Sequence, residues 1–271
     1  MTATDPATLA DFRARQERRR AEAYTRFFSP VTARFAGALV RRLGHPAGPA
    51  LDLGCGDGVV TRELRAAGWA SLALDISPEL AAAALAGTGG PVVIGDALRL
   101  PLASASLAAA ASAFVLPHLD DLDAALTETR RVLRRDGVLA LAGWAPAAVS
   151  PFTGLSADLL RERAAATEER LLAEAGQRTD ADHLATRLAA AGFAEVTVET
   201  ATTVVRLPSP GHWWKGLVGG SCGFTELLQV QSREVQQATR EAFLAEARDF
   251  TVGGEEVAVP AAALLIRGRA A

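Results

Sequence analysis

Three closely spaced glycines and a carboxylate that precedes them are the clearest chemical signal in the sequence. They lie in Leu51-Asp-Leu-Gly-Cys-Gly-Asp-Gly58, which follows a short apolar run, Pro49–Leu53, and precedes a helical pattern that begins at Val59. Glycine tolerates positive φ and close approach of a ligand, and the first N–H groups of a helix have no partner within the helix. The stretch therefore predicts a strand, a tight turn and a helix that together bind a cofactor.

The spacing of the glycines distinguishes two classes of cofactor. Dinucleotide-binding turns read G-x-G-x-x-G, whereas this turn reads G-x-G-x-G and has Val59 at the third glycine position of that pattern. Asp52 also lies two positions before Gly54. An NAD(P) oxidoreductase would need the glycine that Val59 replaces, so the turn disfavours a pyrophosphate.

A second carboxylate lies about 20 residues past the turn, the distance at which nucleotide-binding α/β folds carry a ribose ligand. Leu72-Ala-Leu-Asp75 reads as a second apolar strand that ends in this carboxylate. Ser77 and Pro78 then provide an N-cap and a first-turn proline for the next helix. Asp75 is therefore predicted to accept hydrogen bonds from both ribose hydroxyls.

The glycine turn closely resembles the first motif of class I S-adenosylmethionine (SAM) dependent methyltransferases, [VL]-[LVI]-[DE]-[LVI]-G-C-G-x-G. Two later segments are also similar to motifs of that family and follow in the family's order: Gly95-Asp-Ala-Leu-Arg-Leu-Pro101 and Arg130-Arg-Val-Leu-Arg-Arg-Asp-Gly137. In the second of these, Arg135-Asp136 replaces the Pro-Gly of the family's R-V-L-[RK]-P-G-G. The nearest type is the small-molecule enzymes, such as quinone C-methyltransferases and their relatives in specialised metabolism.

The resemblance implies a set of cofactor contacts. In the family the acid after the third strand receives the adenine amino group, a role that falls to Asp96. A segment similar to Tyr24-Thr-Arg-Phe27 closes over the methionine end of the cofactor, although here its apolar face could instead only pack the helix on the sheet. The predicted cofactor-binding residues are Asp52, Gly54, Cys55, Gly56, Asp75, Ile76, Asp96, Ala97, Ala113 and Tyr24.

Methyl transfer from SAM is an in-line displacement, so the enzyme mainly aligns the acceptor and excludes water. A general base is needed only when the acceptor must lose a proton. The candidate base is His118, which follows the predicted fourth strand, Leu107–Leu116. Alternatively, His118 caps the next helix or bonds to Asp120 or Asp121.

Aromatic residues on segments near the predicted site suggest an apolar or ring-containing acceptor. Trp213 and Trp214 follow Pro-Gly-His, and two adjacent tryptophans are not expected both to point inward from a regular element. Whether the methylated atom is O, N or C stays open. The predicted substrate-binding residues are Phe28, Trp144, Trp213 and Trp214.

Together these elements predict an α/β fold, Rossmann-like and of the class I methyltransferase type. Seven mostly parallel strands carry helices on both faces, and a final antiparallel hairpin ends the sheet. The predicted segments are an N-terminal helical cap over 1–46, a SAM-binding core over 47–207 with a cover segment at 145–178, an acceptor-side lid insertion over 208–250 that includes a helix over 226–248, and the last core strand within 251–271.

Composition disfavours several other classes of protein. The chain has 271 residues, of which 49% are hydrophobic, but no apolar segment long enough to cross a bilayer. A net charge of −3 gives no general attraction to nucleic acid. The scattered histidines and the distant Cys55 and Cys222 predict neither a metal site nor a disulfide. We expect a cytoplasmic monomer or homodimer whose partners are SAM and a small-molecule methyl acceptor.

A second hypothesis is a SAM-binding, methyltransferase-like protein that catalyses another reaction, such as a cyclisation, or has no catalytic role. Asp75 and Asp96 would bind the cofactor in either case, so release of S-adenosylhomocysteine separates the two hypotheses. The fourth strand also lacks the [DNS]-P-P-[YF] signature of enzymes that methylate amino groups of nucleic acids.

Overall fold

The computed structural model describes residues 18–19, 21–115, 118–119, 121–164 and 180–271. Its eight-stranded sheet has the order β3-β2-β1-β4-β5-β8-β6, and the short β7 pairs with β8. The neighbours from β3 to β5 pair in parallel, whereas β8 is antiparallel to both β5 and β6. This arrangement confirms the predicted Rossmann-like α/β fold, although the short β7 adds a strand to the seven that were predicted. The strands are β1 Pro49–Leu53, β2 Ala70–Asp75, β3 Val92–Ile94, β4 Leu107–Ala113, β5 Leu133–Trp144, β6 Phe193–Leu207, β7 Thr251–Gly253 and β8 Glu256–Ala270.

Helices cover both faces of the sheet because side chains alternate between the faces along each strand. In β4, Ala109 and Ala111 join the apolar cluster of α2 and α3, while Ala110 joins the opposite cluster with α5 and α8. Helix α4 packs at the edge of the sheet, against β2 and β3. The helices are α2 Ser29–Arg41, α3 Val59–Ala66, α4 Pro78–Thr88, α5 Leu122–Val132 and α8 Ala181–Ala190.

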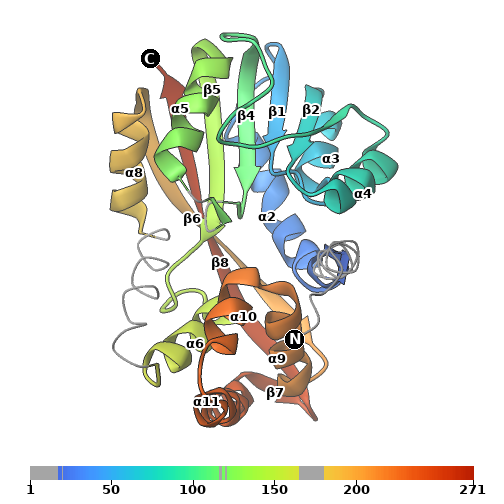
Figure 1. The fold of residues 1–271 in the computed structure, drawn as a ribbon, viewed down its shortest axis with the longest axis vertical. Coiled ribbons are helices and arrows are strands. Elements are labelled where there is room, and N and C mark those ends of the chain that lie inside the picture. Colours follow the sequence, from blue (N-terminus) through green and yellow to red (C-terminus); the bar gives the residue numbers. More distant parts are fainter. Residues whose placement is uncertain (1–17, 20, 116–117, 120, 165–179) are drawn as a thin grey trace, which may run out of the picture.

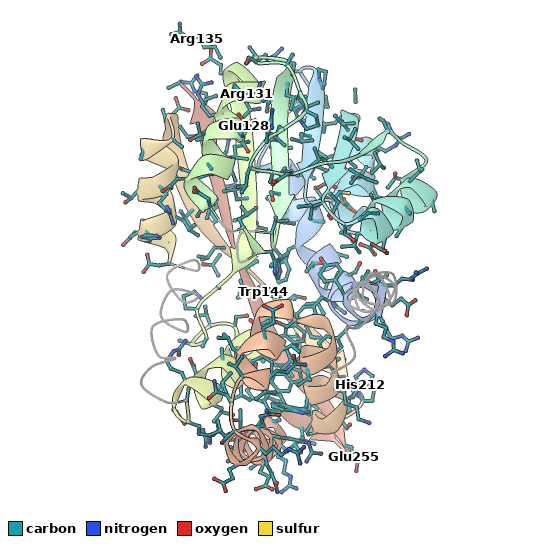
Figure 2. The ribbon with its side chains drawn as sticks, viewed as in Figure 1. Glu128, Arg131, Arg135, Trp144, His212 and Glu255 are labelled. Carbon is teal, nitrogen blue, oxygen red and sulfur yellow. The ribbon has the colours of Figure 1, made fainter. Side chains whose placement is uncertain are left out.

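The two longest strands, β6 and β8, continue past the parallel strands into a second group of helices (Figure 1). Each has 15 residues, a span of roughly 50 Å at the usual rise per residue. We call this group the helical lobe; it comprises α6 Pro151–Arg161, α9 Pro210–Gly220, α10 Cys222–Gln229, α11 Arg233–Glu246 and the 3₁₀ turn η2 Ala247–Phe250. Trp144, the last residue of β5, lies where the lobe meets the sheet (Figure 2).

One expectation about the helical lobe is wrong. The single helix predicted over 226–248 is interrupted, since α10 ends at Gln229 and α11 begins at Arg233. Ser232 provides the N-cap of α11, and its Oγ accepts a hydrogen bond from the N–H of Val235. Much of the predicted cover segment, residues 165–178, lies outside the described residues. Within the described part of the chain, no helix combines the length and apolarity needed to cross a membrane.

Candidate cofactor-binding site

A cavity of about 420 Å³ lies at the carboxyl ends of β1, β2, β3 and β4. Its size suits a single small ligand. Ligands of open α/β folds bind at this edge of the sheet, where the loops after the strands converge. The lining residues are Ala21, Tyr24, Gly54, Gly56, Leu74, Asp75, Ile76, Ser77, Leu80, Gly95, Asp96, Ala97, Leu98, Ala113, Phe114, Val115, His118, Leu119 and Gly220.

The glycine turn after β1 forms the floor of the cavity in a backbone conformation that favours glycine. Gly54, Gly56 and Gly58 have φ values of 70°, 55° and 85°, which residues with a Cβ rarely adopt. A Cβ at Gly54 would also collide with Val115, and one at Gly58 would lie 2.7 Å from Thr88 Cγ2. Gly58 is the N-cap of α3 and offers no side-chain cap, so the first N–H groups of that helix have no capping side chain.

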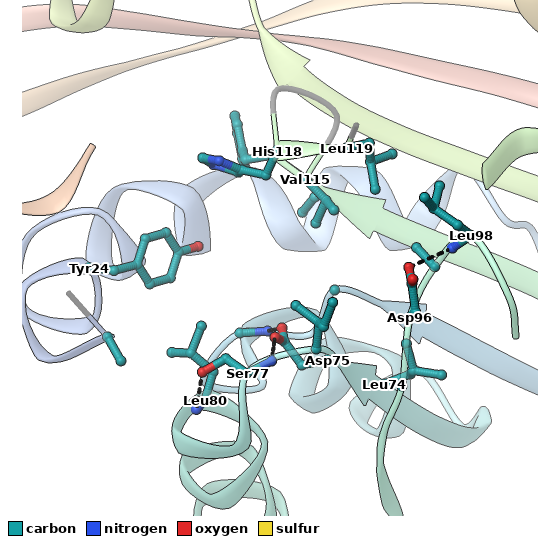
Figure 3. A pocket seen from close by; sticks show the side chains of 18 of the residues that line it. Tyr24, Leu74, Asp75, Ser77, Leu80, Asp96, Leu98, Val115, His118 and Leu119 are labelled. Atoms are coloured by element: carbon teal, nitrogen blue, oxygen red, sulfur yellow. Dashed lines mark hydrogen bonds between the residues drawn. The ribbon is translucent and has the colours of Figure 1, made fainter. Parts of the chain in front are cut away.

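Asp75, the last residue of β2, joins the glycine turn to the start of α4. Its Oδ2 accepts a hydrogen bond from the N–H of Gly56 at 2.8 Å, and its Oδ1 accepts one from the N–H of Ser77 at 2.9 Å (Figure 3). The residue is buried, and burial raises the pKa of its carboxyl group above the ordinary value, although these backbone hydrogen bonds oppose the shift. A carboxylate oxygen can accept more than one hydrogen bond, so Asp75 can also accept bonds from a ligand in the cavity.

Two predicted cofactor contacts do not line the cavity, since Asp52 lies beneath the turn and Cys55 is buried within it. Asp52 is 1% exposed, and its Oδ2 accepts a hydrogen bond from Thr61 Oγ1 at 2.5 Å, while its Oδ1 has no hydrogen-bond partner among the described residues. Burial raises the pKa of Asp52 to about 7, and the nearby Asp75 adds to the shift. Burial also raises the pKa of the Cys55 thiol, which keeps this cysteine protonated and unreactive.

Asp96 begins the loop after β3 and lies at the opposite end of the cavity from Tyr24, with Asp75 between them (Figure 3). Its Oδ1 accepts a hydrogen bond from the N–H of Leu98 at 2.9 Å, which holds the side chain in a tight turn. Asp96 is exposed, so its other oxygen is open to a ligand. Ala97 and Leu98 line the same end.

Tyr24 and His118 share the other end of the cavity (Figure 3). Burial raises the pKa of Tyr24 to about 12, so its phenol stays neutral and can donate a hydrogen bond at physiological pH. The backbone N–H of His118 donates to the carbonyl of Val115 at 2.8 Å. The charge of the His118 side chain lowers the pKa of Asp75. Asp120, one of its predicted partners, lies outside the described residues.

Phe28 and Trp144, predicted to contact the acceptor, do not line the cavity but lie behind residues that do. Their ring centroids are 6.2 Å apart, and the Trp144 ring lies 4.4 Å from that of Phe114, which does line the cavity. Phe114 has a φ of 61°, an uncommon conformation for a bulky residue. The aromatic cluster therefore supports Phe114 from behind.

Trp213 and Trp214 of α9 belong to the core of the helical lobe, and neither lines the cavity. Trp213 is fully buried, and its Nε1 donates to the carbonyl of Phe152 at 2.9 Å. The Trp214 ring packs against Phe224 and Phe243. The expectation that adjacent tryptophans cannot both point inward from a regular element is wrong, because other elements cover α9 on more than one side.

The structure brings together all the other predicted cofactor residues and adds several that the sequence analysis missed. Ser77 and Leu98 belong to motifs already recognised and could have been inferred from them. Ala21 and Gly220 carry no local signal, because they meet at the cavity from helices almost 200 positions apart. In the described segments, no group of three His, Cys, Asp or Glu residues could hold a metal ion.

Residues 51–141 match a family model described as a methyltransferase domain. The matched segment runs from the glycine turn to β5 and contains Asp75 and Asp96. The match covers roughly a third of the chain, so this segment is similar to a methyltransferase domain. The sheet order and the position of the cavity agree with this similarity.

Among curated proteins, this chain is similar to the malonyl-[acyl-carrier protein] O-methyltransferase of Serratia marcescens, at 36% identity over 96 residues. That match covers 35% of this chain and 38% of the relative. An uncharacterized protein of Methanocaldococcus jannaschii is 40% identical over 88 residues, which cover 32% of this chain and 34% of that protein. The similarity therefore spans little more than a third of either relative.

Two solved structures share the fold over most of this chain. A SAM-dependent methyltransferase of Thermotoga maritima has a TM-score of 0.53 at 19% identity and covers 94% of this chain and 98% of its own. The phosphoethanolamine N-methyltransferase 2 of Haemonchus contortus, solved with S-adenosylhomocysteine, has a TM-score of 0.51 at 13% identity and covers 86% and 51%. At these identities the likeness concerns the fold alone.

Proposed function

We propose that the protein transfers a methyl group from SAM to an O, N or C atom of an uncharged, apolar or aromatic small molecule. The observation that carries the proposal is the buried Asp75 carboxylate, which accepts hydrogen bonds from the N–H groups of Gly56 and Ser77 and borders a ligand-sized cavity. This arrangement places the glycine turn and a carboxylate that could bind ribose at the edge of the same cavity.

The residues around the cavity fit SAM. Asp75 would accept hydrogen bonds from the ribose hydroxyls and Asp96 one from the adenine amino group, while Ile76, whose side chain is 69% exposed, would cover one face of the base. The N-terminus of α3 would face the methionine carboxylate. Bound SAM supplies an electrophilic methyl group. The S-adenosylhomocysteine in the Haemonchus contortus neighbour supports the same class of ligand.

The charges of the lining suit a cationic cofactor and an uncharged acceptor. Asp75 and Asp96 line the cavity, Asp52 lies just beneath it, and no described lining residue is a lysine or arginine. Among the described lining residues only His118 could pair with a buried anionic acceptor, and a buried anion without a partner is costly. At the acceptor end, Phe114 provides an apolar wall and Tyr24 a neutral hydroxyl.

His118 is the side chain that we propose as general base when the acceptor must lose a proton. It lines the cavity at the Tyr24 end, away from the Asp96 loop (Figure 3). Histidine changes charge near neutral pH, which suits proton transfer under physiological conditions. For an acceptor that needs no deprotonation, alignment and exclusion of water would be sufficient.

The N-terminal cap and the insertion over 208–250 would together cover the acceptor. A Cβ at Gly216 would collide with the Phe27 ring, and one at Gly220 would lie 2.8 Å from Phe28 Cδ2. Two glycines one helical turn apart thus let α9 approach the N-terminal helical residues closely. We call this contact the glycine clasp. Because Gly220 and Tyr24 both line the cavity, the clasp closes its acceptor end.

Release of S-adenosylhomocysteine tests the proposed reaction. The purified protein is incubated with SAM and a panel of phenols, quinones and amines, and the product is measured by mass spectrometry together with the methylated acceptor. The proposal predicts turnover with at least one uncharged member and none with phosphorylated or carboxylated analogues. Tight SAM binding without turnover across a wide panel would favour a SAM-binding protein with another role.

A further inference from the structure

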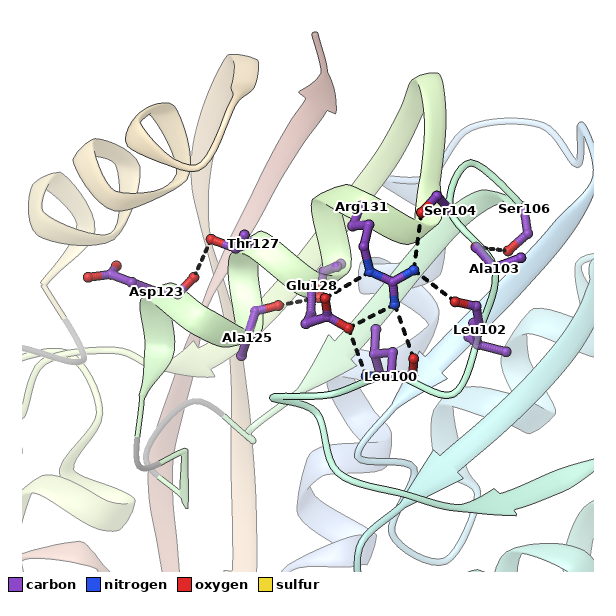
Figure 4. Close-up of polar contacts among 11 residues, drawn as sticks. Leu100, Leu102, Ala103, Ser104, Ser106, Asp123, Ala125, Thr127, Glu128 and Arg131 are labelled. Atoms are coloured by element: carbon purple, nitrogen blue, oxygen red, sulfur yellow. Dashed lines mark hydrogen bonds and ion pairs between the residues drawn. The ribbon is translucent and has the colours of Figure 1, made fainter.

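Arg131 of α5 makes a set of contacts that the proposed reaction does not explain. Arginine has five N–H donors in a rigid fork, and here each has an acceptor (Figure 4). Nε and Nη2 donate to Oε1 and Oε2 of Glu128, both at 2.8 Å. Nη2 also donates to the carbonyl of Leu100 at 3.1 Å, and Nη1 donates to the carbonyl of Leu102 at 2.9 Å and to Ser104 Oγ at 3.2 Å.

Glu128, one turn earlier on α5, completes this network. Its Oε2 accepts a hydrogen bond from the N–H of Leu100 at 2.9 Å. Helix α5 therefore holds both backbone groups of Leu100, the N–H through Glu128 and the carbonyl through Arg131. The hydrogen bonds from Arg131 lower the pKa of Glu128, so its carboxylate is ionised and a strong acceptor at neutral pH.

These contacts hold the middle of the loop between β3 and β4, whereas backbone hydrogen bonds of Gly95, Ala105 and Ser106 hold its two ends. Residues 95–106 join β3 to β4 and form neither helix nor strand, and most of them are exposed, with Leu100 buried. The first part of this loop lines the cavity with Asp96, Ala97 and Leu98. The N–H of Arg99 donates to the carbonyl of Asp96 at 3.1 Å, so a single turn separates Asp96 from the clamped Leu100.

We propose that Arg131 and Glu128 are positioning residues that hold the Asp96 loop in the shape that recognises adenine. Neither residue lines the cavity. Their effect on the ligand passes through the backbone at Leu100 and the turn from Asp96 to Arg99. A loop already ordered before binding loses less conformational freedom when the base arrives, which favours affinity and selectivity. This inference rests on the proposed binding of SAM.

The test compares two ligands that differ only in the base. S-adenosylhomocysteine offers an amino group to Asp96, whereas S-inosylhomocysteine has a carbonyl in its place. Calorimetry with the full-length chain gives both dissociation constants for wild type, Arg131→Ala, Arg131→Lys and Glu128→Gln. We expect Arg131→Ala to bind S-adenosylhomocysteine about tenfold more weakly and to lose most of the preference for it. Arg131→Lys, which has fewer donors and no fork, should fall between.

Arg187→Ala is the matched control. Arg187 of α8 makes a bidentate ion pair with Asp123 of α5, with both N···O distances at 2.7 Å, and this pair lies away from the Asp96 loop. The control should keep both the affinity and the preference. Thermal unfolding of each variant establishes that the protein is folded, and Arg131→Lys serves if Arg131→Ala does not fold.

Two results would overturn the inference. One is an Arg131 variant with wild-type affinity for both ligands, and the other is a variant with an equal loss of affinity for both, which would mean that the network only stabilises the fold. If wild type binds neither ligand, the proposed function itself fails. If wild type binds and discriminates while the variants discriminate equally well, only the inference about Arg131 and Glu128 fails.

Discussion

The two ends of the cavity are built in different ways. At the end that we propose for the cofactor, the ends of the strands bring backbone groups and carboxylates to the cavity. The two oxygens of Asp75, for example, accept hydrogen bonds from the N–H groups of Gly56 and Ser77. At the end that we propose for the acceptor, helices from distant parts of the chain pack against one another, as where Gly220 of α9 faces Phe28. The first end depends on a fixed backbone conformation, and the second on the shapes of side chains.

This difference explains which end the sequence reveals. Positive φ at Gly54, Gly56 and Gly58 favours one residue type at a fixed spacing, so the pattern can be read directly. A packing surface tolerates many apolar residues provided that their volumes fit together. The cofactor end therefore carries motifs, whereas the acceptor end does not.

The largest expected effect is a loss of stability when a buried ring is removed from the core of the helical lobe. Trp213→Ala should lower the free energy of unfolding by about 3–5 kcal/mol, because it removes a fully buried ring and the hydrogen bond from Nε1 to Phe152. Urea denaturation measures the loss. The matched control is Lys215→Ala, an exposed position on the same helix, which should change little. A Trp213→Ala protein of wild-type stability would show that this ring does not support the lobe.

An effect of similar size, about 3–5 kcal/mol in activation free energy, is expected at the end of the cavity where we propose that the reaction occurs. If the acceptor is a phenol or an enolisable carbon, His118→Ala should lower kcat by about 10² to 10⁴-fold and leave the affinity for S-adenosylhomocysteine intact. Steady-state kinetics with the acceptor found in the panel, measured from pH 5.5 to 9, check both. An unchanged kcat would mean that alignment and water exclusion suffice without a protein base.

Individual residues show how much of the candidate site could be predicted from the sequence. Asp75, Asp96, Gly54 and Gly56 were predicted as cofactor contacts from their fixed spacing along the chain, and all four line the cavity. Asp52 was also predicted as a cofactor contact, but it lies buried beneath the turn, where it accepts a hydrogen bond from Thr61, and does not line the cavity. Trp213 was misplaced because nothing local indicates that α6 and α11 cover α9, a contact that the connectivity of the whole lobe determines.

The stability of the cofactor end should depend on pH in a direction set by Asp52. Because burial raises its pKa from 3.8 to about 7, the folded protein binds a proton between these values that the unfolded chain has released. Stability should therefore fall as pH rises from about 4 to 7, by up to about 1.4 kcal/mol per pH unit. Asp75, whose pKa is also raised, contributes with the same sign.

Denaturation at several pH values measures this slope, and Asp52→Asn provides the comparison. The amide keeps an acceptor for Thr61 Oγ1 but does not titrate, so its slope should be smaller than that of wild type. Equal slopes in the two proteins would show that Asp52 does not carry the proton.

The smallest effect concerns the glycine clasp. Gly220→Ala places a Cβ 2.8 Å from Phe28 Cδ2 and 3.3 Å from the carbonyl oxygen of Ala23, so the two helices must move slightly apart. We expect a several-fold rise in the acceptor KM and little change in cofactor affinity. In Gly223→Ala, where the added Cβ meets nothing within 4 Å, both values should stay at wild type. Equal changes in both variants would contradict a role for the clasp.

Calorimetric titration of S-adenosylhomocysteine into wild type and Asp75→Ala tests whether Asp75 joins the glycine turn to a SAM site. The variant loses an acceptor for both ribose hydroxyls at about 1.5–3 kcal/mol for each hydrogen bond to the charged group. Binding should therefore weaken by at least about 100-fold, and wild type should show no heat with NAD at the same concentrations. Equal affinity of the two proteins for S-adenosylhomocysteine would mean that Asp75 does not bind the ribose.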